Sequence, residues 1–107
     1  MNEVWTSICD VSSLKPDTVL AAEVDGKPIA VYFVDDRYFA TDNVCPHAYA
    51  LLSDGWLEGK EIECPLHGAR FDIETGAVID GPAECGLKTY EVRVECNEVQ
   101  CRAPESN

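Results

Sequence analysis

Basic residues and long apolar segments are scarce in this sequence. Eight lysines and arginines stand against twenty aspartates and glutamates, which gives a formal net charge of −12. A chain this acidic is a poor ligand for nucleic acid or for an anionic membrane surface. No apolar run approaches the ~18 residues of a membrane span, and the first residues lack the positive start and apolar centre of a signal peptide. We therefore expect a cytoplasmic protein with no nucleic-acid or membrane partner.

Histidine is also scarce, and its two occurrences share one setting. His47 ends a C-P-H motif and His67 ends a C-P-L-H motif, with 16 residues between the motifs. Thiolates suit zinc or iron-sulfur clusters and imidazoles suit zinc or iron, so two short turns that each supply one of both can converge on one inorganic centre. The proline after each cysteine favours a tight loop over a helix face. We predict that Cys45, His47, Cys64 and His67 form one metal site.

The order of these donors separates two kinds of metal site. A zinc finger with C-x2-C and H-x3-H spacing has both thiols in one half and both histidines in the other. Here each half contributes one of each, as a two-iron cluster needs if one iron is held by both cysteines and the other by both histidines. A structural zinc module that binds another protein is the alternative from a different class. Two irons with two acid-labile sulfides would support the first reading, and one zinc with no sulfide the second.

The two motifs belong to a longer pattern that resembles a known family. In chain order it contains Cys45-Pro46-His47, Leu52-Ser53-Asp54-Gly55, Cys64-Pro65-Leu66-His67-Gly68, Phe71-Asp72 and Thr75-Gly76. It resembles the Rieske 2Fe-2S signature, and most of all that of the small Rieske ferredoxins of multicomponent aromatic-ring-hydroxylating dioxygenases, such as the naphthalene and biphenyl systems. The resemblance covers nearly the whole chain, because Gly81-Pro82-Ala83 is similar to the family's third, proline-bearing loop.

This resemblance implies both a fold and a cofactor. The fold would be all-β, an antiparallel β-sandwich base with a small cluster-binding lobe inserted at about residues 44–76 of a single domain, 1–107. The cofactor would be one Rieske 2Fe-2S cluster per chain, with Cys45 and Cys64 on the inner iron and His47 and His67 on the outer iron. The closing strand of the family would correspond to residues 87–92.

The resemblance also implies a role and partners. A Rieske ferredoxin of this kind is a soluble one-electron carrier, here expected to be a monomer, between an NAD(P)H-dependent flavin reductase and the terminal oxygenase. Oxygen activation needs a mononuclear iron, usually held by two histidines and a carboxylate. If the cluster takes both histidines, none remain, so we expect no catalytic residue and no enzyme activity in the chain itself. A Rieske subunit of another redox enzyme is the second alternative.

Departures from the family pattern predict a low reduction potential. Rieske proteins of respiratory and photosynthetic complexes carry an extra cysteine in each ligand loop, where this chain has Ala50 and Leu66. Those proteins also place hydroxyl donors near the cluster sulfurs, where this chain has Ala69 and Phe71. Hydrogen bonds to sulfur stabilise the reduced cluster. We therefore predict a potential toward the low end of the roughly −150 to +300 mV Rieske range.

The other cysteines and several aromatic and apolar residues invite plainer expectations. Cytosolic thiols are normally reduced, so the remaining cysteines are expected to be partly buried and unbridged, with a Cys96 to Cys101 disulfide left open. We expect Trp56 to be a core or interface residue, and Leu51 and Leu52 to pack and to shield the cluster from water. The remaining cysteines are Cys9, Cys85, Cys96 and Cys101.

Turn signals and alternating apolar residues predict the strands. We expect the first forty residues to form one antiparallel meander, in which Asp25-Gly26 is the strongest hairpin signal. A second hairpin turns at Glu58-Gly59-Lys60 and leaves the two ligand loops at neighbouring ends. After a strand at 70–73, residues 79–86 are expected to be irregular. One long strand at 87–95 and a closing strand at 99–102 complete the prediction.

Overall fold

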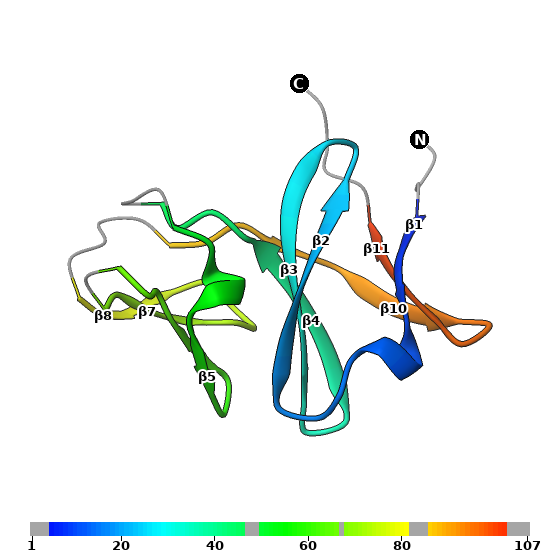
Figure 1. Ribbon diagram of the computed structural model, residues 1–107, viewed down its shortest axis with the longest axis horizontal. Coiled ribbons are helices and arrows are strands. Elements are labelled where there is room, and N and C mark those ends of the chain that lie inside the picture. The colour runs from blue at the N-terminus through cyan, green and yellow to red at the C-terminus, as the bar shows by residue number, and fades with distance from the viewer. Residues whose placement is uncertain (1–4, 47–49, 67, 82–85, 103–107) are drawn as a thin grey trace.

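The computed structural model describes residues 5–46, 50–66, 68–81 and 86–102, and these residues form antiparallel sheets in three layers (Figure 1). The first sheet has the order β1 (Trp5–Asp10), β11 (Glu98–Arg102), β10 (Val92–Glu95). The second has the order β2 (Thr18–Val24), β3 (Lys27–Val34), β4 (Arg37–Asp42), β9 (Thr89–Tyr90). The third has the order β5 (Trp56–Glu58), β6 (Glu61–Glu63), β7 (Arg70–Asp72), β8 (Val78–Asp80).

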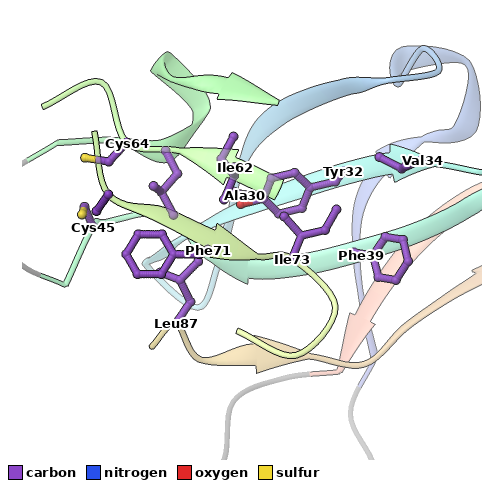
Figure 2. Packing of buried hydrophobic residues seen from close by; sticks show 12 residues of the cluster. Ala30, Tyr32, Val34, Phe39, Cys45, Ile62, Cys64, Phe71, Ile73 and Leu87 are labelled. Atoms are coloured by element: carbon purple, nitrogen blue, oxygen red, sulfur yellow. The ribbon is translucent and has the colours of Figure 1, made fainter. Parts of the chain in front are cut away.

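Strand β3 explains why the second sheet is the middle layer. Four consecutive apolar residues, Ile29 to Tyr32, are buried on alternating faces, so the strand reads as a continuous apolar run instead of an alternating one. Ile29 and Val31 pack with residues of the first sheet. Ala30 and Tyr32 pack against the third sheet (Figure 2). We call the third sheet, together with residues 45–50 and 64–69, the cluster lobe, and the other two sheets the base.

The predicted all-β architecture is confirmed, but the predicted meander is wrong at its first strand. Strand β1 pairs with β11, from Trp5 opposite Arg102 to Asp10 opposite Glu98. The one-turn 3-10 helix η1 (Val11–Ser13) then leads the chain to the second sheet. The meander therefore contains only β2, β3 and β4, because β1 finds its partner at the other end of the chain.

The predicted long strand at 87–95 is also divided. Tyr90 of β9 lies opposite Ala40 of β4, whereas Val92 of β10 lies opposite Cys101 of β11. The chain therefore passes from one sheet of the base to the other within two residues. Two residues that we predicted to be irregular, Ile79 and Asp80, belong instead to β8, the edge strand of the lobe sheet.

Cysteines outside the motifs are free where the structure describes them. Cys101 is fully buried, and burial raises its pKa to about 11. Cys9 is half-buried, and its pKa is raised mainly by burial and to a smaller extent by the nearby Asp10 carboxylate. Cys96 is exposed in the turn before β11, contrary to our expectation of partial burial, and it does not bridge to Cys101. Cys85 lies outside the described residues.

The helices within the described ranges are the short η1 and η2 (Leu52–Asp54). Neither of them is long and apolar enough to cross a membrane.

Candidate metal centre

The two cysteine motifs begin loops that the backbone closes in the same way. The Cys45 N–H donates to the Ala50 carbonyl at 2.9 Å, and the Cys64 N–H donates to the Ala69 carbonyl at 2.8 Å. A pair of residues in β-bridge geometry flanks each loop. The pair outside the first loop is an isolated β-bridge, and the pair outside the second is the one at the end of the β6–β7 pairing. Two equivalent loops of six residues thus start at the predicted thiol ligands. The flanking pairs are Val44 with Leu51 and Glu63 with Arg70.

Both thiols lie in the apolar core between the lobe and the base. Cys45 is 2% exposed and Cys64 is fully buried. Figure 2 shows the two side chains at the same end of the core, on neighbouring loops. The Leu66 N–H lies 3.5 Å from the Cys64 Sγ and donates to it. Two buried thiols with a backbone donor fit thiolate ligands of an inorganic centre, since hydrogen bonds to sulfur favour its more negative form.

The predicted imidazole ligands lie outside the described residues. His47 and Tyr49 belong to the first loop, where the described residues stop at Pro46 and resume at Ala50, and His67 belongs to the second, between the described Leu66 and Gly68. Pro82, the proline of the predicted third loop, also lies outside the described residues. The structure therefore brings together Cys45 and Cys64, and the histidine ligands stay a prediction from the two motifs.

A buried asparagine that our sequence analysis missed supports the first loop. Asn43 is 1% exposed, and its side-chain amide exchanges two hydrogen bonds with Ser53: Nδ2 donates to Oγ at 3.0 Å, and Oδ1 accepts from the Ser53 N–H at 2.8 Å. Its backbone carbonyl accepts from the Leu52 N–H, and its N–H donates to the Pro28 carbonyl. Asn43 therefore joins β3, η2 and the start of the loop. The sequence signal was weak, a single asparagine two residues before Cys45.

The start of the third loop lies directly on the second ligand loop. Gly81 has φ +99°, and a Cβ at this position would lie 2.6 Å from the Ala69 Cα. Only a glycine allows this approach and this backbone conformation without displacement. Gly81, the residue before the proline of the predicted third loop, is thereby held against the loop that begins at Cys64.

Apolar side chains surround the loops, partly as predicted. Leu52 is fully buried, which confirms that it packs, whereas Leu51 is 41% exposed. Leu66 and Val44 are exposed to a similar degree. Val44 and Leu51, which flank the first loop, and Leu66 in the second therefore form an exposed apolar rim beside a hollow lined by Val44, Ala50, Leu51 and Asp54.

Comparisons with known proteins agree with this arrangement. Residues 4–91 match the model of the Rieske [2Fe-2S] domain. The ferredoxin component of the naphthalene 1,2-dioxygenase system of Pseudomonas aeruginosa is 43% identical over 92% of this chain and 95% of its own length. The Sphingomonas yanoikuyae B1 ferredoxin has a TM-score of 0.87 and 40% identity, covering 96% of this chain and 100% of that one.

A further structural match is a chain in a complex of reduced oxygenase and oxidized ferredoxin in carbazole 1,9a-dioxygenase. Its TM-score is 0.89 at 36% identity, with 99% of each chain covered. The chain described here therefore belongs to the Rieske [2Fe-2S] family. Its relatives within that family include ferredoxin components of aromatic dioxygenase systems, which confirms the resemblance stated for residues 45–76.

Proposed function

We propose that this protein is the one-electron carrier of an aromatic-ring dioxygenase system, receiving electrons from an NAD(P)H-dependent flavin reductase and passing them to the terminal oxygenase. The observation that carries the proposal is the pair of buried thiols at the starts of two equivalent loops. The ferredoxin components among its relatives support the role. We further propose that the protein is monomeric and cytoplasmic.

In this proposal each chain holds one Rieske 2Fe-2S cluster. Cys45 and Cys64 ligate the inner iron, and His47 and His67 ligate the outer iron. When bound, the cluster supplies one-electron chemistry at a potential above that of all-cysteine clusters, because two thiolates leave the oxidised centre neutral where four would leave it doubly negative. The burial of both thiols supports their place on the inner side of the lobe.

The chain's own residues position the centre and exclude water from it. Leu52 and Phe71 are fully buried in the core that contains both thiols. The Leu66 N–H donates to one thiol, and the apolar rim of the loops can be covered by a partner protein. The two histidines are then both committed, so no catalytic iron site is proposed in this chain.

Electron paramagnetic resonance of the dithionite-reduced protein tests the cofactor. A rhombic spectrum with an average g below that of all-cysteine clusters, together with two irons and two acid-labile sulfides per chain, is the expected result. One zinc without sulfide would overturn the proposal and favour the structural zinc module. Reduction of purified naphthalene, biphenyl and carbazole oxygenase components, with a flavin reductase as donor, then tests the role.

Ligand substitution tests the assignment residue by residue. His67→Cys is expected either to lose the cluster or to convert it toward an all-thiolate spectrum at lower potential, because a thiolate adds negative charge to the centre. Iron content, spectrum and potential are the measurements. Cys96→Ser is the control, since this exposed cysteine lies in the turn between β10 and β11 and should leave all three unchanged. Unchanged content and potential in His67→Cys would refute the ligand assignment.

A further inference from the structure

The lobe sheet has one buried face and one that faces solvent. Leu57, Ile62, Phe71 and Val78 lie opposite one another across the four strands and pack toward the base. Because side chains alternate along a strand, their neighbours point the other way. The side chains of this outward face are Trp56, Glu58, Glu61, Glu63, Arg70 and Asp72. Asp80 joins them because a bulge in the pairing of β7 with β8 places it opposite Arg70. We call these seven residues the outer face of the lobe.

Trp56 is the most exposed large apolar residue that the structure describes. It is 62% exposed, although tryptophan contributes more buried apolar area than any other residue when it packs. It lies opposite Glu63, the residue before Cys64, so it stands at the end of the sheet that carries the ligand loops. We expected a core or interface residue here; the structure excludes the core.

The other tryptophan, Trp5, differs from Trp56 because a cationic side chain of the same chain covers its ring. The Arg93 guanidinium lies 4.4 Å from the ring centre of Trp5, which is half-buried. Within the described ranges, no lysine or arginine lies over the ring of Trp56 in this way. Its face is therefore open to a cation from another molecule.

The charge around Trp56 points to the same kind of partner. The outer face contains five carboxylates and one guanidinium, that of Arg70. That guanidinium is already engaged, because it donates to Glu61 and lies 3.9 Å from Glu58. The face thus combines an open aromatic ring with excess negative charge. The complementary surface is positively charged and offers an arginine or lysine at its centre.

We propose that the outer face of the lobe docks on a basic surface of the terminal oxygenase, with a cationic side chain of that partner stacked on Trp56. The inference rests on the proposed electron-carrier function and adds a binding surface beside the ligand loops. Trp56 lies opposite Glu63, the residue before Cys64. A partner docked on Trp56 is therefore close to the centre that must pass the electron. The carboxylates steer the encounter, and the ring supplies the specific contact.

Two substitutions on the outer face, with two matched controls, test this surface. Trp56→Ala removes the ring, and Glu58→Lys reverses a charge whose side chain is 90% exposed. The controls are Val94→Ala and Glu95→Lys on β10, an exposed apolar residue and an exposed acid on the side of the base opposite the lobe (Figure 1). The probe is the oxygenase component that the wild-type protein reduces fastest among naphthalene, biphenyl and carbazole oxygenases.

Trp56→Ala should raise the dissociation constant for that oxygenase about tenfold, the scale expected when an interface tryptophan is truncated. Trp56→Phe should recover part of the loss. Glu58→Lys should slow association and flatten its dependence on ionic strength. Cluster content, midpoint potential and the KM for reduction by the flavin reductase should match the wild type in all variants. The controls should bind as the wild type does.

Wild-type affinity in both outer-face variants would overturn the inference, as would equal losses in the controls. A change confined to the KM for the reductase would assign the surface to the other partner and overturn it as stated. If the wild-type protein contains no Rieske cluster, or reduces none of the oxygenases, the proposed function itself has failed. The two failures are therefore distinguishable, since only the second appears in the wild-type protein.

Discussion

At the scale of single residues, the second ligand loop depends on a backbone approach that a methyl group would block. In Gly81→Ala the new Cβ would meet the Ala69 Cα, and the backbone would be held at φ +99°. We expect a loss of about 1–3 kcal/mol in the free energy of unfolding and a broadened or shifted paramagnetic spectrum. Thermal unfolding and the spectrum of the reduced protein measure these effects.

Gly59→Ala is the matched control for this prediction. Gly59 also has a positive φ, +58°, but a Cβ there would have nothing within 4 Å. Gly59→Ala should therefore lower the free energy of unfolding only by the cost of the positive φ, about 1 kcal/mol, and leave the paramagnetic spectrum unchanged. Equal effects of the two substitutions would show that the contact with Ala69 is unimportant.

The same loop offers a residue-level test of the reduction potential. Ala69 is fully buried, and its carbonyl accepts from the Cys64 N–H. Ala69→Ser is expected to raise the midpoint potential if its hydroxyl reaches a cluster sulfur, because that hydrogen bond stabilises the reduced form. Potentiometric titration followed by paramagnetic resonance measures the shift. Ala77→Ser, at an exposed position, is the control, and an unchanged potential in Ala69→Ser would mean that the loop directs the hydroxyl elsewhere.

At the scale of elements, β9 is joined to β4 by a short pairing and one side-chain contact. The Tyr90 hydroxyl donates to Asp42 at the end of β4, and Lys27 lies 3.6 Å from the same carboxylate. The pKa of Tyr90 is raised well above its ordinary value, mainly by partial burial and to a smaller extent by the hydrogen bond to Asp42. This contact closes the sheet immediately before Asn43 and the first ligand loop.

Tyr90→Phe should lower the free energy of unfolding by about 1 kcal/mol at pH 7, the typical value of one hydrogen bond. Because the folded-state pKa is raised, the unfolded state loses its proton first, and this contribution disappears as pH rises from the unfolded value of about 10 toward the folded one. Between pH 9 and pH 11 the wild-type protein should therefore lose more stability than the variant. Chemical denaturation across that range measures the difference, and parallel curves would contradict it.

The elements also show how far sequence reasoning reaches. The starts of the ligand loops were predictable because each is marked by a motif of three to five adjacent residues, and the hairpins because Asp25-Gly26 and Gly59 mark their turns. The pairing of β1 with β11 and the change of sheet between Tyr90 and Val92 were not. Both depend on contacts between distant segments, which no local pattern encodes. The role of Asn43 was missed for the same reason, because its partners lie on β3 and η2.

At the scale of the whole molecule, the two predicted thiol ligands are also core residues. Cys45 and Cys64 belong to the apolar cluster that holds the lobe on β3, so loss of the centre should loosen that cluster. In Cys64→Ser we expect the amides of β6 and β7 to lose hydrogen-exchange protection, while those of β2 and β3 retain it. Exchange followed by mass spectrometry measures both, with Cys96→Ser as the control. Uniform loss throughout the chain would show that lobe and base unfold as one unit.

The two ends of the lobe segment meet where it leaves the base. The Asp42 N–H donates to the Lys88 carbonyl at 2.9 Å, so the residues between them start and finish at neighbouring points of adjacent strands. A segment with this geometry could be transplanted as a cassette between two paired strands of another β-protein. The floor of the segment, however, is formed by Ala30, Tyr32 and Val34 of β3. A recipient would therefore need that three-residue stripe as well as a suitable gap, and this is the minimum sequence that a portable version of the centre must include.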